Sequence, residues 1–174
     1  MVEPGAALSA LMICLLAVAA SADIAYRIIP NWITVALALL GMALRLPAGP
    51  YALLISLCIA LAVFAGMVLL HARGVFGGGD VKLLAATCLG FAPAAANRFI
   101  FVTAMAGGVL ALIHLVGRRL VRNRPPRAPP PRGSSLLRRI VSIEIWRLAR
   151  HGSLPYGVAI ACGGIWVILA GSRN

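Results

Sequence analysis

Residues 51–71 read YALLISLCIALAVFAGMVLLH and contain no Asp, Glu, Lys or Arg. A helix needs roughly 17–25 largely apolar residues to cross the hydrocarbon of a bilayer, so this run predicts a transmembrane helix. Similar apolar runs lie on both sides of it. Within lipid each can only be a helix, because a strand hairpin would leave backbone groups unpaired. The expected spans are Ala6–Ala22, Trp32–Leu46, Tyr51–His71, Val81–Ala96, Phe99–Gly117 and Pro155–Gly171.

The composition agrees with several spans in one chain. The sequence has 174 residues, of which 61% are hydrophobic, and its mean hydropathy is +0.97; a soluble domain needs far fewer apolar residues. We therefore expect an all-α polytopic membrane protein with about six transmembrane helices and a single membrane-embedded domain over residues 1–174. Ala20-Ser21-Ala22 resembles a signal-peptidase site, but Glu3 and the lack of Lys or Arg before it favour retention of the first span.

Positive charge is distributed unevenly among the connections between the spans. The net charge is +12, and thirteen basic residues fall on one side: Arg27, Arg73, Lys82, Arg118, Arg119, Arg122, Arg124, Arg127, Arg132, Arg138, Arg139, Arg147 and Arg150. The other side has only Arg45, Arg98 and Arg173. The positive-inside rule then places both termini on the non-cytoplasmic side, and the connections that carry Asp23 and Asp80 in the cytoplasm.

The connection between the fifth and sixth spans, at about residues 118–154, is rich in arginine and proline. Its first part, Arg118–Arg132, is typical of an extended, semi-rigid linker, and Leu136–Arg150 mixes apolar and basic residues as a helix at a membrane surface does. Attraction to anionic lipid is worth about 1 kcal/mol per basic residue near the surface. We expect this basic cytoplasmic loop to contact anionic membrane lipid. We expect no nucleic-acid partner, because the charge is concentrated on one membrane face.

Cysteine and histidine do not form a recognisable metal site in the sequence. Cys14, Cys58, Cys88 and Cys162 stand alone in four different spans, and the three histidines form no short-range cluster. The cysteines are therefore expected to be small apolar residues within helices. We expect neither a metal ion nor a cofactor.

The first of the only two aspartates ends the first span. It begins the stretch Asp23-Ile-Ala-Tyr-Arg27-Ile-Ile-Pro30-Asn31, in which Pro30 and Asn31 open the second span. Proline suits the first turn of a helix, where its missing N–H has no partner in any case. A purely structural interpretation stays open here: a polar helix end followed by a turn, with an Asp23–Arg27 ion pair.

The second aspartate follows a run of glycines, Gly77-Gly78-Gly79-Asp80-Val81-Lys82, which leads into the fourth span. Glycine lets another part of a chain approach the backbone closely. The structural interpretation is that Asp80 is the N-cap of the helix, since the wider pattern of a phosphate-binding loop is absent. Capping alone does not explain why both aspartates face the same side.

Two aspartates that meet at a membrane edge can catalyse hydrolysis. A charged residue costs roughly 2.5–3.5 kcal/mol at the centre of a membrane helix, so carboxylates in such places are expected to be functional. Like charges a few ångströms apart do not both ionise easily, and one carboxyl keeps its proton. The ionised carboxylate activates water, and the protonated carboxyl polarises the peptide carbonyl. The sequence does not decide which part Asp23 and Asp80 each play.

At these residues the chain resembles the type IV prepilin peptidases, membrane aspartic proteases of the glycine-x-glycine-aspartate class. The resemblance rests on Asp23, on Ile29-Pro30-Asn31, and on Gly77-x-Gly79-Asp80-Val81-Lys82 with its continuation Leu83-Leu84-Ala85-Ala86. A further match is Pro155-Tyr156-Gly157 at the head of the last span. With six spans in the expected order, the resemblance covers nearly the whole chain.

The resemblance implies a substrate and a site. Members of the family remove short basic leader peptides from prepilins or pseudopilins at the cytoplasmic face of the bacterial inner membrane, and their catalytic pair maps to Asp23 and Asp80. Residues expected to support the site or bind substrate are Gly77, Gly78, Gly79, Lys82, Arg27, Pro30, Asn31, Pro155, Tyr156 and Gly157. Lys82 could instead contact lipid phosphate, Arg27 could only orient the chain, and Tyr156 could only anchor it at the interface.

The chain also departs from the larger members of that family, which carry an extra cytoplasmic segment with paired cysteines and an N-methyltransferase activity. Here the first connection has only about nine residues and no cysteine pair. We therefore expect a peptidase without methyltransferase activity, similar to the small form associated with tight-adherence pili. The basic loop has no counterpart that we can assign.

Other functions remain compatible with these residues. A preflagellin-type or presenilin-like protease would apply the same chemistry to another substrate, although Asp23 lacks the preceding tyrosine expected of the presenilin type. A small transporter or assembly subunit would use Asp23 and Asp80 as a proton relay, but relays usually place their acids within the membrane depth. A homo-oligomer is compatible with the sequence as well.

Overall fold

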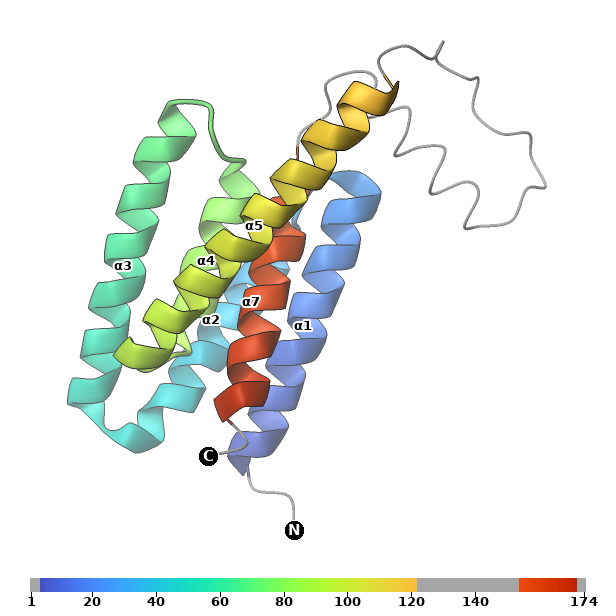
Figure 1. Ribbon diagram of the computed structural model, residues 1–174. Helices are drawn as coiled ribbons and strands as arrows, with labels where there is room; N and C mark the ends of the chain where they lie inside the picture. The colour runs from blue at the N-terminus through green and yellow to red at the C-terminus, as the bar shows by residue number, and fades with distance from the viewer. Residues whose placement is uncertain (1–3, 122–153, 172–174) are drawn as a thin grey trace. The chain divides into compact units, whose positions relative to one another are not determined.

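The chain is helical throughout the parts that the structure describes. The computed structural model describes residues 4–121 and 154–171, and these residues form no strand, which confirms the all-α prediction (Figure 1). The helices are α1 (Pro4–Tyr26), α2 (Asn31–Arg45), the short 3-10 helix η1 (Leu46–Ala48), α3 (Pro50–Ala72), α4 (Gly78–Leu89), α5 (Pro93–Val121) and α7 (Tyr156–Gly171).

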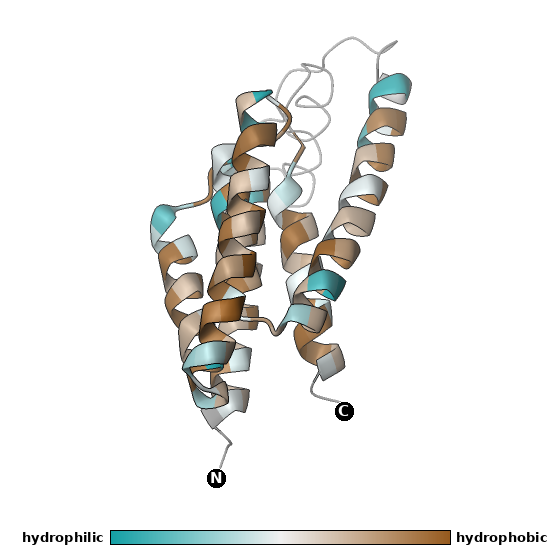
Figure 2. Cartoon of the chain, turned by 90° about the vertical axis from the view of Figure 1, so that its left-hand side faces the viewer, coloured by the Kyte–Doolittle hydropathy of each residue, from teal (hydrophilic) through white to brown (hydrophobic). Residues whose placement is uncertain are grey.

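Four stretches among the described residues have the length and apolar composition needed to cross a membrane: α1, α2 with η1, α3 and α5. The sixth predicted span corresponds to α7, which is apolar but has only 16 residues. Hydrophilic residues gather mainly toward the helix ends (Figure 2). The chain is therefore a multi-pass membrane protein, as predicted.

The fourth span, predicted at Val81–Ala96, was placed wrongly at its end. Helix α4 stops at Leu89, where Gly90 is its C-cap, and α5 begins at Pro93. A proline lacks an N–H and its ring clashes with the carbonyl four residues earlier, so one continuous helix cannot pass through Pro93. Proline fits the first turn of α5 instead. With 12 residues, α4 covers about 18 Å at ~1.5 Å per residue, less than the roughly 30 Å of hydrocarbon.

Helix α4 is buried inside the larger of two compact units, whose described part comprises residues 4–107 and 155–171. It packs against α2, α3 and α7, and most of its residues from Val81 to Leu89 are buried. Beyond its end, Arg45 Nε donates a hydrogen bond to Ser56 Oγ (3.0 Å), which in turn donates to the carbonyl of Phe91 (3.1 Å). These bonds fix the chain that leaves α4.

Helices α1 and α7 lie side by side in this unit. Gly163 and Gly164 are buried in α7, and a Cβ added at Gly164 would lie only 2.7 Å from Leu16 Cδ1 of α1. The two helices are therefore closer than larger side chains would permit. This contact keeps the start of α7 against the last turn of α1, although the two segments are far apart in the sequence.

The second unit comprises residues from Gly108 to Leu154, and its described part is the last portion of α5 together with Leu154. Helix α5 continues to Val121, so residues 118–121, which we expected in an extended linker, are helical. The remainder of the predicted basic loop, residues 122–153, lies outside the described residues.

The close contact between α2 and α4 provides a test of this packing. A Cβ at Gly41 would lie 2.8 Å from the backbone nitrogen of Gly90. Because overpacking against a backbone cannot be relieved by a side-chain rotation, we expect Gly41→Ala to lower the free energy of unfolding by about 1–3 kcal/mol. The melting temperature of the purified protein in detergent measures the effect. Gly66→Ala is the control, since a Cβ there meets nothing within 4 Å; equal melting temperatures for the two variants would contradict the packing.

Candidate active site

Asp23 lies in the last turn of α1 and is buried, with 6% of its surface exposed. The backbone N–H of Gly157, the second residue of α7, donates a hydrogen bond of 2.8 Å to Asp23 Oδ2. A Cβ added at Gly157 would lie 2.9 Å from the same oxygen, so glycine is the residue that lets this amide reach the carboxylate. The positive end of a helix favours a negative charge at this place.

Four residues after Asp23, the backbone of Arg27 adopts a left-handed conformation. Its φ is 56°, and its N–H donates to the carbonyl of Asp23 at 2.9 Å. Residues other than glycine reach this conformation at a cost of about 1 kcal/mol or more. The turn ends α1 and sends the chain through Pro30, which precedes the first residue of α2.

Asp80 lies in the first turn of α4, but it is not the N-cap that the sequence suggested. The helix begins two residues earlier, with Gly77 in the N-cap position, because Gly78 and Gly79 are helical. From the third helical position the Asp80 carboxylate accepts a hydrogen bond from the backbone of Gly77, in the geometry of half a capping box. The Asp80 side chain therefore satisfies the backbone N–H of the N-cap residue Gly77, instead of Asp80 itself being the N-cap.

The environment of Asp80 changes its acidity. Burial and, after it, the negative charge of Asp23 raise the pKa of Asp80 from 3.8 to about 6, and the Gly77 hydrogen bond and the charge of Arg27 oppose that rise. A like charge disfavours ionisation only when it is close. The two aspartates therefore act on each other across the site.

Both aspartates line one open cavity of about 280 Å³ at the ends of α1, α2 and α4. Its walls are formed by Asp23, Arg27, Ile28, Ile29, Asn31, Gly77, Gly78, Gly79, Asp80 and Lys82. Eight of these residues were expected at the site from the sequence. Ile28 and Ile29 were not among them, and the signal that could have found them is their place between Asp23 and Asn31.

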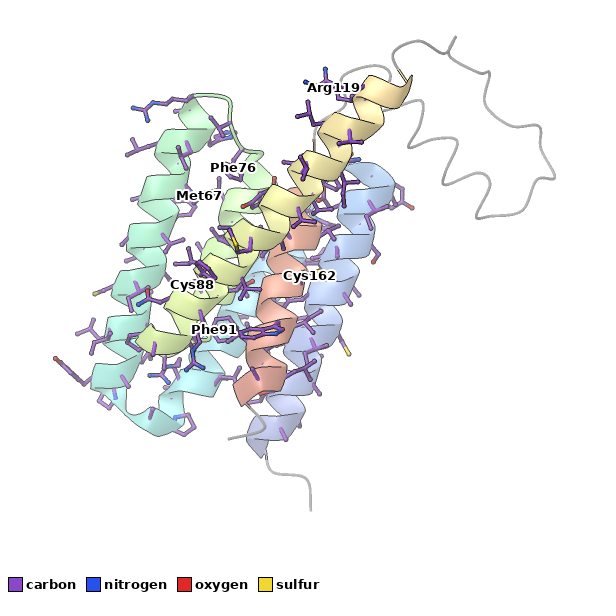
Figure 3. The ribbon with its side chains drawn as sticks, viewed as in Figure 1. Met67, Phe76, Cys88, Phe91, Arg119 and Cys162 are labelled. Carbon is purple, nitrogen blue, oxygen red and sulfur yellow. The ribbon has the colours of Figure 1, made fainter. Side chains whose placement is uncertain are left out.

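Hydrogen bonds and ring contacts tie the surrounding connections together. Lys82 Nζ donates to Asn31 Oδ1 at 3.1 Å and so joins α4 to the start of α2. Phe76, which is labelled in Figure 3, lies in the connection before α4. Its ring packs edge-on against Tyr156, with centroids 4.7 Å apart. Sequence reasoning missed Phe76, which has no motif to mark it. Ile29 packs on Gly79, where a Cβ would lie 3.3 Å from Ile29 Cβ.

The remaining predicted residues, Pro30, Pro155, Tyr156 and Gly157, are not among the residues that line the cavity. The phenol of Tyr156 is close enough to Asp80 to feel its charge, Gly157 binds Asp23, and Pro155 forms the turn that starts α7, with its carbonyl accepting the N–H of Val158. Within residues 4–121 and 154–171, no group of three His, Cys, Asp or Glu side chains is arranged to hold a metal ion. The site thus combines two unlike carboxyl groups, two cationic side chains and an opening to the outside.

Comparison with known protein families gives a match. A family model described as the type IV leader peptidase family matches residues 10–112, more than half of the chain. The matched range contains both aspartates and every wall residue of the cavity, whereas the start of α7 lies beyond it. No curated protein and no solved structure matches the chain.

The charge of Arg27 offers a test of the electrostatics. Because this charge lowers the pKa of Asp80, we expect Arg27→Gln to raise the pKa of Asp80 above about 6. The chain has only four acidic residues, so the protonated carboxyl band in an infrared pH titration reports on few groups. Arg73→Gln is the control, because Arg73 is exposed and is not among the charges that act on Asp80. An unchanged or lowered pKa in the Arg27 variant would contradict the arrangement.

Proposed function

The chain belongs to the type IV leader peptidase family, and on this basis we propose that it is an aspartic endopeptidase whose catalytic pair is Asp23 and Asp80. The observation that carries the proposal is the convergence of the chain's only two aspartates on one open cavity. Hydrolysis of a peptide by two carboxyl groups needs one ionised carboxylate to accept a proton and one protonated carboxyl to donate one. The raised pKa of Asp80, at about 6, makes a mixed protonation state available near neutral pH.

The reaction follows from the pair. The ionised carboxylate takes a proton from water while the water oxygen attacks the scissile carbonyl, and the protonated carboxyl gives its proton to the carbonyl oxygen. The resulting gem-diol collapses when the carboxyl group that took a proton from water passes this proton to the amide nitrogen. The C–N bond then breaks, and the other carboxylate recovers its proton from the gem-diol.

We propose that the substrate is a prepilin or pseudopilin, cut between its leader peptide and its hydrophobic segment. Such a substrate would present its cleavage site at the membrane surface and could meet the exposed side chain of Ile28 in the cavity wall. Arg27, Arg73 and Lys82 lie at the same helix ends as the cavity. By the positive-inside rule, this end faces the cytoplasm of a bacterial inner membrane.

The short connection between α1 and α2 bears on the methyltransferase activity of the larger family members. The connection between α1 and α2 comprises only residues 27–30, which is too short for the extra cytoplasmic segment of the methylating members. We propose a peptidase that does not methylate its product, of the small form associated with tight-adherence pili. Preflagellin-type and presenilin-like proteases would use the same chemistry on another substrate. A proton relay would use the same two aspartates without cleaving a substrate.

The catalytic pair is tested by leader removal. We expect the wild-type protein, co-expressed with a candidate prepilin, to shorten it by the mass of the leader. Asp23→Asn and Asp80→Asn keep the size of the side chain but remove its titration, so each is expected to lower the cleavage rate by at least about a hundredfold. Mass spectrometry of the prepilin gives the readout.

Ser21→Ala is the matched control on α1. Its hydroxyl is exposed and donates only to carbonyls of its own helix, so this variant should cleave at the wild-type rate. Normal cleavage by both asparagine variants would end the aspartic peptidase proposal. If wild-type protein cuts prepilins of no kind but both asparagine variants abolish a proton flux in vesicles, the relay is the better account.

A further inference from the structure

The start of α7 interacts with both aspartates, by a hydrogen bond to Asp23 and by electrostatics with Asp80. The Gly157 amide donates to Asp23, whereas the neighbouring Tyr156 places a phenol near Asp80. The family model matches residues 10–112, so the start of α7 lies outside the matched range. The difference bears on which aspartate is the base.

Asp23 is placed where a negative charge is favoured. Its Oδ2 accepts a buried, charge-assisted hydrogen bond of 2.8 Å from Gly157, and the amide belongs to the first turn of a helix, whose positive end points at the carboxylate. A hydrogen bond to the ionised form of an acid favours that form. Neutral Asp23 would lose most of this stabilisation.

For Asp80, the influences that favour the protonated form outweigh those that favour the ionised form. It also accepts a backbone hydrogen bond, from Gly77, but burial and the charge of Asp23 outweigh that bond and the charge of Arg27, and its pKa rises to about 6. When two acids interact, the second proton is retained by the group whose charge is less well compensated. Because the charge of Asp23 is one of the causes that raise the pKa of Asp80, we infer that Asp80 is this group.

We propose, on the footing of the peptidase function above, that Asp23 is the general base and Asp80 the general acid, and that the Gly157 amide makes this assignment. Gly157 is a positioning residue, since its amide acts through Asp23. In the first step Asp23 takes the proton of water and Asp80 gives its proton to the carbonyl oxygen. In the second step Asp23 protonates the amide nitrogen as the C–N bond breaks, and Asp80 regains a proton from the gem-diol.

Other titratable or charged groups face this pair from the packed helices. Arg27 and Lys82 line the cavity, His71 of α3 lies beside Gly78, and Tyr156 stands at the start of α7. Helix α2 contributes the uncharged Asn31. A shift specific to the base must therefore be separated from changes in these groups, which calls for a matched pair of variants.

The matched pair is Gly157→Pro and Gly157→Ala. Both add a Cβ against Asp23, but only proline removes the N–H, and proline is tolerated in the first turn of a helix. In the pH dependence of kcat/KM, protonation of the base sets the acid limb and ionisation of the acid sets the alkaline limb. We expect the acid limb of Gly157→Pro to lie about one pH unit or more above that of Gly157→Ala, with the alkaline limb much less displaced.

A second measurement decides the matter if Gly157→Pro does not fold. In wild-type protein labelled with [13C]aspartate, only two side-chain carboxyl signals exist, and Asp80→Asn identifies them. We expect the Asp23 signal to stay ionised to a lower pH than the Asp80 signal. An acid limb that is equal in the two Gly157 variants, or an Asp23 signal that titrates above Asp80, overturns the assignment. Cleavage by the two asparagine variants would instead overturn the peptidase function itself.

Discussion

The hydrogen bond from the Gly157 amide to Asp23 joins the last helix to the first and fixes the site. The two residues are 134 positions apart in the sequence, and they meet because Gly163 and Gly164 let α7 lie close to its neighbours α1 and α5. A carboxylate that is buried without a partner costs several kcal/mol. The amide therefore both stabilises the fold and determines how Asp23 is presented to the cavity.

The second constraint is the shortness of α4. The helix is surrounded by α2, α3 and α7, and the break before Pro93 limits it to 12 residues. Its buried sides hold Asp80 at the edge of the helical unit, within reach of the Asp23 charge and open to the cavity. The arrangement places an acid of raised pKa beside an acid whose charge is compensated, which is the asymmetry that acid–base hydrolysis requires.

The sequence predicted the all-α membrane fold, the approximate course of the helices and eight residues of the cavity wall, because apolar runs and rare charged residues carry those signals directly. It placed the end of α4 wrongly, since an apolar run across residues 81–96 hides the effect of Pro93. The structural alternative, in which Asp80 is the N-cap, was wrong, because the run Gly77-Gly78-Gly79 does not reveal where helical geometry begins. The Gly157–Asp23 bond could not be predicted, since it depends on how two distant helices pack.

The central claim is that Asp23 and Asp80 converge on one cavity, and an intramolecular cross-link tests it most directly. In a background with the four cysteines changed to serine, Asp23→Cys and Asp80→Cys would be combined and treated with a short thiol-specific bifunctional reagent. We predict an internal cross-link, detected by mass after proteolysis, and none when the second cysteine replaces Arg45 at the far end of α2. Failure of the 23–80 pair to cross-link, with both thiols shown to react singly, would contradict the account.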